Sequence, residues 1–478
     1  MNEDAFTRGD GVVVYDLVVI GGGAAGFAAA LQAESLETKT LMINSGLPPG
    51  GTCVNVGCVP SKHLLEVGHD LFYPKTPRFS SLSPATIELD FSRTMMEKEE
   101  LVAALRKSNY TDVVDEFKRT EFKEGVASFV SEEEVKVDGR NIKGRRFILA
   151  TGSTTRVPPV PGLGEIEYLT NESILSLASL PDSLLVLGGG PLGLEFAQMF
   201  QHFGSKVTVL EMMDRILPME EPEISHEIHK LLEDEGIRIH ARAKAKKVVQ
   251  QDGRIIVSAD VGTIERSFEG ERLLVATGVK AKTAGLNLER AKVAVNQMGF
   301  IHVDHELRTS NAHVFAAGDC TGTMPLETVA AKQGYVAALN ALTDSQERMD
   351  YTSIPHAVFT DPQVASVGLT EEQLMEREGV CACRVIPLSK VAKALTVKDT
   401  RGILKMVVNP KTTKVVGVHV VAPGAAEIIT AATYAIKMGM TVDDIIDTVH
   451  VFPTFAEVLK LAALAFRMNV DVMPCCVV

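Results

Sequence analysis

The sequence predicts an α/β protein with two nucleotide-binding domains and an α+β domain at its C-terminal end. A strand, a glycine-rich turn and a helix follow one another between Val12 and Leu31, and the same pattern restarts at Ser183, about 170 residues later. After about residue 345, short β-rich runs mix with helical stretches. A length of 478 residues is compatible with about three domains.

The composition limits the classes of partner. With 46% hydrophobic residues and 38 glycines, the chain can bury large cores and form many tight turns. Its net charge of −13 argues against a general nucleic-acid binder, which usually presents a basic face. The opening residues lack the basic-then-apolar order of a signal peptide, and Asp16 and glycines interrupt the first apolar stretch. We therefore expect a cytoplasmic protein that binds neither nucleic acid nor membrane.

The first nucleotide-binding unit begins with the apolar run Val12–Ile20, which predicts a buried strand. A GGGAAG turn follows, then an alanine-rich helix and a second strand, Thr40–Ile43. In such a turn the first glycine permits the tight bend, the second lets the backbone approach a pyrophosphate, and the third lets the helix pack close to the strand. The helix N-terminus adds N–H donors for the phosphate. The glycines in these positions are Gly21, Gly23 and Gly26.

The second unit repeats this order with the strand Ser183–Leu187, the helix Leu194–Phe203 and the strand Lys206–Leu210. One glycine turn alone is weak evidence, but two of them, each between a strand and a helix, predict two Rossmann-like domains. The glycines of the second turn are Gly188, Gly190 and Gly193.

The residue that follows the second strand of each unit usually reads the ribose. In the second unit it is Glu211, whose carboxylate accepts from a 2′-hydroxyl and repels a 2′-phosphate, which favours NADH over NADPH. Arg215 lies nearby and softens that preference. In the first unit the equivalent residue is Asn44, an uncharged amide.

The remaining segments complete the predicted architecture. Residues 75–92 are rich in Pro, Ser and Thr and predict a surface loop, and Glu97–Lys118 predicts a charged helix. Further strands are expected at Arg146–Ala150, Arg272–Ala276, Val314–Ala317, Ala357–Phe359, Gly402–Val408 and Val415–Val421, and further helices at Ala425–Lys437 and Phe455–Phe466.

The seven cysteines are too few for a secreted disulfide framework in a chain of this length. Two close pairs, Cys53/Cys58 and Cys475/Cys476, are the candidates for redox or metal chemistry. The first pair lies in GGTCVNVGCVPSK, where Pro60 suits the first turn of a helix. The helix dipole lowers the pKa of a thiol at that end and favours a thiolate. The flanking glycines and the Pro-Ser-Lys favour a redox pair over two structural core cysteines.

Together, GGTCVNVGCVPSK, the two glycine turns, the two strands that end in ATG and the AAGDC segment resemble the flavoprotein disulfide reductase family, from about Tyr15 to Cys476. The resemblance implies FAD on the first unit, NADH or NADPH on the second, and a homodimer whose active site is shared between subunits. The implied domains are residues 1–153 with 279–345 for FAD, 154–278 for NAD(P)H, and 346–478 for the dimer interface.

The same resemblance implies roles for individual residues. Cys58 corresponds to the charge-transfer thiolate beside the flavin, and Cys53 to the interchange thiol that faces the substrate. Lys62 and Glu195 correspond to an ion pair near flavin N5, and Asp319 to a ligand of the flavin ribityl or phosphate region. Further positions implied in cofactor binding are Gly46, Gly51, Thr52, Ala127, Thr151, Gly152, Gly278 and Glu327.

Two features distinguish between branches of this family. A disulfide between the adjacent Cys475 and Cys476 is a strained small ring, so a reduced dithiol is expected, and two soft thiolates suit Hg(II). This ending is similar to that of mercuric reductases, which implies that Hg(II) is captured there, is passed to Cys53 and Cys58 of the partner subunit, and is reduced to Hg(0).

The second feature is an absence. Family members that act on disulfides carry His-Pro-Thr followed by a glutamate, whereas this chain has Phe452 before Pro-Thr, and then Glu457. Phenylalanine cannot take a proton, which argues against glutathione or lipoamide as substrate. His450 would share the face of Phe452 if this segment were a strand, but at another height.

Other interpretations remain open. A tail dithiol also relays electrons in large thioredoxin reductases, and a non-catalytic thiol protein would sequester metal. The tyrosine that mercuric reductases often carry near this Phe-Pro segment is missing, which leaves the inner metal ligands undefined. Cys381 and Cys383 are expected to be structural, with a metal site as the alternative, and Cys320 is expected to be buried.

Overall fold

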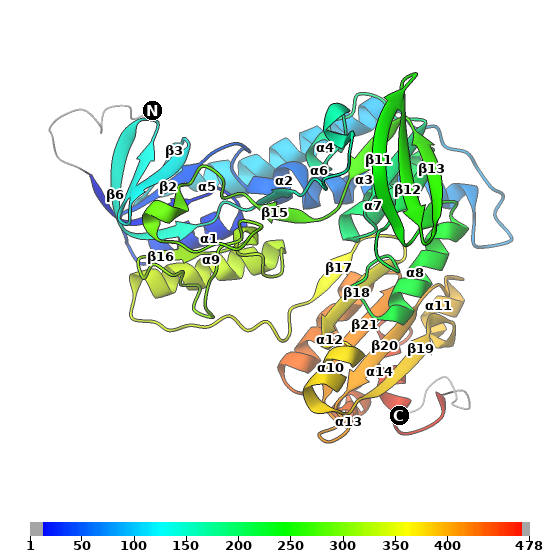
Figure 1. The fold of residues 1–478 in the computed structure, drawn as a ribbon. Coiled ribbons are helices and arrows are strands. Elements are labelled where there is room, and N and C mark those ends of the chain that lie inside the picture. Colours follow the sequence, from blue (N-terminus) through cyan, green and yellow to red (C-terminus); the bar gives the residue numbers. More distant parts are fainter. Residues whose placement is uncertain (1–12, 471–478) are drawn as a thin grey trace. The chain divides into compact units, whose positions relative to one another are not determined.

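The computed structural model describes residues 13–470, which form two compact units (Figure 1). The first unit comprises the described residues up to Val59 together with Glu100–Thr154 and Val279–Met349. The second comprises Pro60–Glu99, Thr155–Gly278 and the described residues from Asp350 onward. Within 13–470, no helix has the length and apolar character needed to cross a membrane.

A seven-stranded sheet organises the first unit. Its order is β3-β2-β1-β6-β5-β4, with β16 pairing to β6. The strands around β1 are parallel and β4 to β6 are antiparallel. The apolar run of β1 is almost wholly buried, as expected for a parallel strand covered on both faces. The strands are β1 (Val14–Ile20), β2 (Thr40–Asn44), β3 (Thr120–Glu124), β4 (Ala127–Ser131), β5 (Glu134–Val137), β6 (Arg140–Leu149) and β16 (Val314–Ala316).

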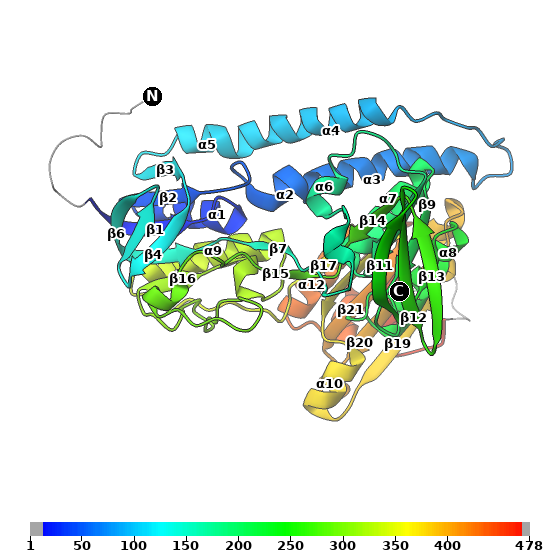
Figure 2. The same cartoon turned by 45° about the horizontal axis from the view of Figure 1, so that its top comes forward.

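Helices α1 (Ala24–Ser35) and α9 (Glu327–Leu342) pack side by side in this unit (Figures 1 and 2). Their backbones approach so closely that a Cβ on Gly334 would overlap the backbone of Ala25. The contact places the middle of α9 against the start of α1, directly after the first glycine turn.

The second unit contains a parallel sheet of order β10-β9-β8-β14 and an antiparallel sheet of three strands, drawn in green in Figure 2. The parallel strands are β8 (Ser183–Leu187), β9 (Lys206–Leu210), β10 (Arg238–His240) and β14 (Arg272–Val275), and the antiparallel ones are β11 (Ala243–Gln251), β12 (Arg254–Val261) and β13 (Ile264–Gly270). Helix α7 (Pro191–Phe203) follows the second glycine turn, and α8 is Pro222–Asp234.

The C-terminal residues of the same unit form a five-stranded antiparallel sheet of order β17-β18-β21-β20-β19. The strands are β17 (His356–Val358), β18 (Gln363–Gly368), β19 (Ala382–Pro387), β20 (Ile403–Val408) and β21 (Val415–Ala422), and the helices are α10 (Glu371–Glu378), α12 (Ala425–Lys437), α13 (Val442–Asp447) and α14 (Glu457–Leu464). Alternate residues of β20 face opposite ways: Met406 lies in the apolar core with α12 and α14, while Lys405 reaches Glu221 and Glu223 beside α8.

Several predicted boundaries differ from the structure. The expected helix Glu97–Lys118 begins earlier, as α4 (Phe91–Arg106), because Asp90 accepts from the backbone N–H of Arg93 and caps it. A π-helical turn at Lys107–Thr111 and the short α5 (Asp112–Asp115) follow. β6 is longer than predicted because its first half pairs with β5 and its second half with β1.

The division into units also groups residues 60–99 with the second unit, whereas the sequence analysis assigned them to the FAD-binding domain. The three predicted domain boundaries stay predictions, since compact clustering separates two units only.

A buried carboxylate ties the C-terminal sheet to the loop before α8. Glu220 accepts from His356 at 2.6 Å and from the Ser366 hydroxyl. Although burial opposes ionisation, the hydrogen bonds from His356 and His419 hold the pKa of Glu220 far below its usual value of 4.5. Glu220 in turn raises the pKa of His356 above 6.5.

These shifts predict a pH window for stability. The lowered pKa of Glu220 stabilises the folded protein above pH 4.5, and this stability is lost as the pH falls through the pKa of Glu220 in the folded state. The raised pKa of His356 stabilises the folded protein below pH 6.5, and this stability is lost as the pH rises through the pKa of His356 in the folded state. We expect Glu220→Gln to lower the free energy of unfolding by about 2 kcal/mol at pH 6, less than for a fully buried pair because His356 is 36% exposed.

Urea unfolding monitored by circular dichroism measures this difference, which should shrink at pH 9. Glu372→Gln on the nearby surface is the control and should stay within about 0.5 kcal/mol of the unaltered protein. An E220Q loss that is equal at pH 6 and pH 9 would contradict the assigned pair.

Candidate active site

The first glycine turn has the backbone that a phosphate site requires. Gly21 has a φ of 129°, and a Cβ there would overlap the carbonyl of Ala150 at the end of β6. A Cβ on Gly26 would overlap the Gly21 carbonyl oxygen, so α1 packs close to its strand. Gly23 is the N-cap of α1, and the backbone N–H groups in the first turn of this helix are available to an anion.

The other predicted residues of the first unit lie mostly around this turn. Asn44 is buried against Gly22 and donates to the Leu47 carbonyl at 2.9 Å. Asp319 accepts from Ser153 at 2.8 Å, and burial raises the pKa of this carboxyl. Thr151 and Gly152 follow β6, and the space where a Cβ of Gly152 would stand has no atom within 4 Å.

Two residues of this set differ in character. Ala127 lies in the apolar core, so only its backbone is available to a cofactor. Gly46 has a φ of 86°, and a Cβ on it would lie 3.0 Å from the Lys282 ammonium. Lys282 was not identified from the sequence; it brings a positive charge to this loop from more than 200 residues away.

The cysteine pair spans the junction of two helices. Cys53 belongs to α2 (Gly51–Val56) with Thr52, and Cys58 is the first residue of α3 (Cys58–Phe72); neither cysteine forms a disulfide bond. Gly57 separates the helices, and a Cβ there would lie 2.9 Å from the Thr52 carbonyl oxygen. The position of Cys58 at a helix N-terminus favours its thiolate.

Glu327, for which a FAD contact was predicted, hydrogen-bonds to the Cys53 thiol and to Tyr110. The hydrogen bond to Cys58, burial and the Glu327 carboxylate together raise the pKa of Cys53 strongly. Burial raises the pKa of Glu327, and burial followed by the Glu327 charge raises that of Tyr110 to about 12. The arrangement favours the protonated form of Cys53.

Tyr110 was missed by the sequence analysis because no local pattern links it to Cys53. Its ring packs edge-on against Phe27, with centroids 4.9 Å apart, and fills the space beside Gly50. Gly50 has a φ of 99°, and a Cβ on it would overlap the Val54 side chain and lie 2.7 Å from the Tyr110 ring, so the backbone and both side chains require glycine here.

In the second unit, Lys62 donates to Glu195 at 2.6 Å, as the resemblance implied for this pair. The other oxygen of Glu195 accepts from the backbone N–H of Phe359 at 2.9 Å. The Lys62 ammonium lies 4.6 Å from the centre of the Phe359 ring. Phe359 follows β17, and the sequence analysis did not identify it as a neighbour of Lys62 and Glu195.

The second glycine turn is held by Glu211. Its carboxylate accepts from the backbone N–H of Gly189 at 2.6 Å and of Met213 at 2.7 Å. A Cβ on Gly190 would meet no atom within 4 Å, and one on Gly193 would overlap the Gly188 carbonyl. The Arg215 guanidinium donates to the Pro218 carbonyl at 3.0 Å, which directs it away from this carboxylate.

Gly278 follows β14 and accepts from the backbone N–H of Arg156 at 2.9 Å. It thus lies at the carboxyl edge of the parallel sheet, where nucleotides bind in such folds.

The segment before α14 is not a strand. Residues 450–454 are irregular, so the condition under which His450 would share a face with Phe452 is not met; the His450 ring lies 3.3 Å from the Ile445 carbonyl. Glu457 begins α14 with Oε2 buried and, within the described part of the chain, without a hydrogen-bond partner. Cys475 and Cys476 lie outside the described residues.

The remaining cysteines are placed clearly. Cys320 is fully buried and contacts the carbonyls of Leu149 and Ala317 at 3.3 Å each, as expected of a core thiol. Cys381 and Cys383 are half-buried at the edge strand β19.

Comparison with known sequences gives two family matches. The pyridine nucleotide-disulphide oxidoreductase family matches residues 15–334, and the dimerisation domain of the same family matches residues 354–463.

Curated relatives match over nearly the whole chain. A mercuric reductase of Streptomyces lividans is 41% identical over 97% of this chain and 98% of its own length, and one of Bacillus cereus is 39% identical over 99% and 75%. A mitochondrial dihydrolipoyl dehydrogenase of Pisum sativum is 32% identical over 94% and 91%.

Among solved structures, the HOCl-induced flavoprotein disulfide reductase RclA of Escherichia coli superposes with a TM-score of 0.84 and 29% identity, covering 94% of this chain and 99% of that one. These matches confirm the predicted fold class, two Rossmann-like domains followed by a C-terminal dimerisation domain.

The environment of Cys53 leads to a test. Because the charge of Glu327 and its hydrogen bond both raise the pKa of Cys53, Glu327→Ala should lower it and expose more thiolate. We expect iodoacetamide to modify Cys53 of the reduced protein roughly three- to tenfold faster at pH 8, since one pKa unit changes the thiolate fraction about tenfold. Peptide mass spectrometry gives the rate for each cysteine.

Tyr110→Phe is the matched control, because it removes a hydroxyl that bonds Glu327 but leaves the carboxylate in place. Its effect on Cys53 should be smaller. An E327A protein whose Cys53 reacts at the unaltered rate, or more slowly, would refute the assigned contact.

Proposed function

The chain belongs to the pyridine nucleotide-disulphide oxidoreductase family, and from this premise we propose that it reduces Hg(II) to Hg(0) with electrons from NADH or NADPH. The observation that carries the proposal is the pair of thiols Cys53 and Cys58, which follow the contact of Gly51 with the first glycine turn. The curated relatives named mercuric reductases support the choice of substrate.

The residues of the first unit fit FAD. A pyrophosphate needs bare backbone at close range, and Gly23, Gly51 and Gly152 present no side chain around the turn. Asp319, tied to Ser153, is the proposed ligand of the ribityl or phosphate region. The chemistry that bound FAD would supply is the transfer of two electrons between the nicotinamide and the thiol pair. The second glycine turn is the proposed NAD(P)H site.

The two thiols divide the work. We assign the thiolate beside the flavin to Cys58, at the start of α3, and the exchange with incoming metal to Cys53, which keeps its proton until Glu327 or solvent removes it. Two thiolates match the preference of Hg(II) for soft ligands. After a two-electron reduction the neutral atom binds sulfur poorly and leaves. Lys62 and Glu195 complete the proposed active site.

We assign the capture of Hg(II) to the two cysteines near the C-terminus. In the homodimer implied by the dimerisation domain, Cys475 and Cys476 of the partner subunit take Hg(II) first and pass it by thiol exchange to Cys53 and Cys58. This chemistry needs reduced thiols and a supply of NAD(P)H, and we therefore propose that the enzyme works in the cytoplasm.

The surroundings of Glu457 disfavour a disulfide substrate. Enzymes that protonate a leaving thiol need an acid–base pair, and here the carboxylate remains while Phe452 replaces its expected histidine partner. The Oε2 atom of Glu457 is buried without a hydrogen-bond partner in the described region, and burial raises its pKa. The second candidate function is that of a dithiol or disulfide reductase resembling thioredoxin reductase or lipoamide dehydrogenase. The third candidate, a protein that only sequesters metal, would show no catalytic turnover.

Removal of the thiols tests the function. Hg(II)-dependent NAD(P)H oxidation, followed by absorbance, should fall at least about a hundredfold in Cys53→Ala because the reacting sulfur is lost. Cys475→Ala/Cys476→Ala should lose turnover when excess small thiol buffers the Hg(II), and retain more of it when the buffer is weak.

Cys381→Ser/Cys383→Ser removes two thiols, as the Cys475→Ala/Cys476→Ala variant does, and serves as the control, with turnover expected to stay unchanged. Normal turnover in both C53A and C475A/C476A would contradict the proposed reduction of Hg(II) through these thiols. Reduction of thioredoxin or lipoamide in preference to Hg(II) would establish the protein as a dithiol or disulfide reductase.

The nucleotide preference follows from Glu211. Its carboxylate repels a 2′-phosphate, so kcat/KM should be higher for NADH than for NADPH. Glu211→Gln keeps one oxygen for the turn and removes the charge, and should shift the ratio toward NADPH by roughly tenfold, equivalent to about 1.4 kcal/mol. Initial rates with both nucleotides measure the ratio, and a ratio that E211Q leaves unchanged would exclude this role.

A further inference from the structure

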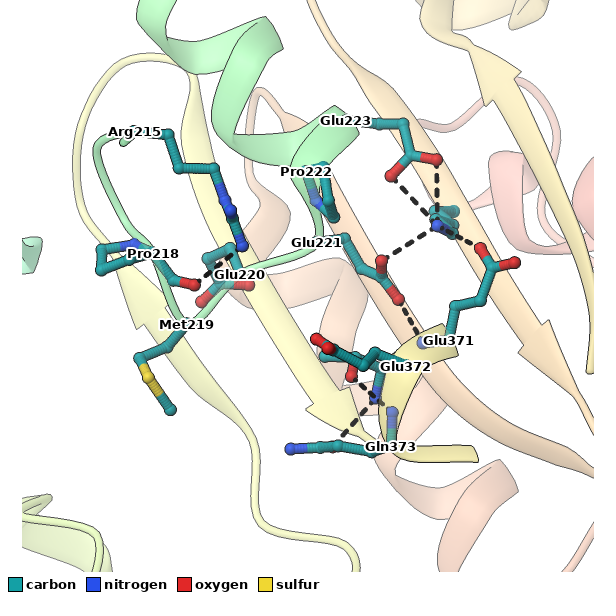
Figure 3. Close-up of a pocket in the computed structure, with 12 residues that line it drawn as sticks. Arg215, Pro218, Met219, Glu220, Glu221, Pro222, Glu223, Glu371, Glu372 and Gln373 are labelled. Carbon is teal, nitrogen blue, oxygen red and sulfur yellow. Dashed lines mark hydrogen bonds and ion pairs between the residues drawn. The ribbon is translucent and has the colours of Figure 1, made fainter. Parts of the chain in front are cut away.

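A pocket of about 450 Å³ lies beside the loop that leads into α8, where the N-terminus of α10 and strand β20 meet it (Figure 3). Five carboxylates and two cationic side chains line it, so the lining attracts cations. The charged residues are Arg215, Glu220, Glu221, Glu223, Glu371, Glu372 and Lys405.

Two thiols gather beside one of these carboxylates. The ligand atoms of Glu371, Cys381 and Cys383 all lie within 4.8 Å of one another. The two sulfur atoms are 2.8 Å apart, and the Cys383 thiol hydrogen-bonds to Glu371. Cys383 belongs to β19 and Cys381 precedes it by two positions, so extended backbone directs both side chains to one face.

The fold brings this trio together from distant parts of the chain. Cys383 pairs in register with Val407 of β20, on the same face of the sheet as Lys405. Glu371 begins α10, and its backbone N–H donates to Glu221 at 2.5 Å. These contacts hold the carboxylate over the edge strand.

Lys405 neutralises only part of the charge. Its side chain is 2% exposed, and its ammonium contacts Glu221 and Glu223 at 2.9 Å and Oε2 of Glu371 at 2.8 Å. One cation thus meets three carboxylates, and Glu371 shares this cation while it also hydrogen-bonds to the Cys383 thiol. The Glu371 side chain is 47% exposed, so an ion has access from solvent.

We propose that Glu371, Cys381 and Cys383 form a second metal site, made of residues other than the redox pair, that takes a thiophilic divalent cation of the Zn(II), Cd(II) or Hg(II) class. Two thiolates and one carboxylate suit such ions and leave one position of a tetrahedron for water. On binding, each thiol exchanges its proton for a bond to the metal and releases that proton to solvent, with no change in oxidation state.

Cd(II) is the probe, because it binds thiolates and is not the reducible substrate. Equilibrium dialysis of the reduced, flavin-loaded enzyme with Cd(II) under anaerobic conditions gives the ions bound per chain. We expect Cys381→Ser/Cys383→Ser to bind one ion fewer than the unaltered enzyme, with Hg(II)-dependent turnover unchanged. Equal Cd(II) stoichiometry in the two proteins would overturn the site.

Single carboxylate variants provide the matched pair. Glu371→Gln should weaken Cd(II) binding at this site at least about tenfold, whereas Glu372→Gln, its neighbour in the same pocket but outside the trio, should leave it unchanged. Equal effects of the two would show that only the general negative charge matters, and would overturn the ligand role of Glu371.

A measurement without any substitution completes the test. Cd(II) should protect Cys381 and Cys383 of the unaltered enzyme from alkylation, as read by peptide mass spectrometry. Unprotected thiols, or a Cys381–Cys383 disulfide that persists in excess reductant, would each refute the proposal.

Discussion

The close approach of two glycines is the constraint on which the first unit depends. Gly51 has a φ of 63°, and a Cβ on it would lie 2.7 Å from Cα of Gly23, in the phosphate-type turn. With any side chain there, α2 would have to move away from the turn and would take Cys53 with it. The contact therefore couples the start of the redox helix to the cofactor loop, and it explains why GG precedes the first cysteine.

Unequal surroundings make the two redox sulfurs different. Cys58, burial and Glu327 all favour the protonated form of Cys53, while Cys58 lies at the N-terminus of α3. Glu327 reaches Cys53 because α9 packs against α1 without side-chain separation at Gly334. A carboxylate thus lies beside Cys53, in a chain that has Phe452 before Pro453. In the proposed reaction, Glu327 is the group that would receive the proton when a cation displaces it from Cys53.

The second unit contains two further thiols, Cys381 and Cys383, that the proposed redox reaction does not use. The second unit combines a buried lysine, three carboxylates that meet it and a half-buried pair of thiols at an edge strand. An edge strand has one unpaired side, and its neighbours are therefore a helix terminus and a loop, which supply polar ligands more readily than a sheet interior does. The acidic lining near Glu371 and the thiol pair together favour ions that are both cationic and soft.

The sequence by itself determined the features that depend on local backbone: both glycine turns, the strands β8 and β9 at their predicted bounds, and the placement of Cys58 at a helix start. Periodicity and turn chemistry act over a few residues, so they can be read directly. Tertiary structure alone decided that Glu327 meets Cys53, that Phe359 meets Glu195, and that Glu371 meets Cys383. Those partners lie far apart in the chain or on opposite sides of a turn, and only the packing of α9, β17 and α10 sets their distances.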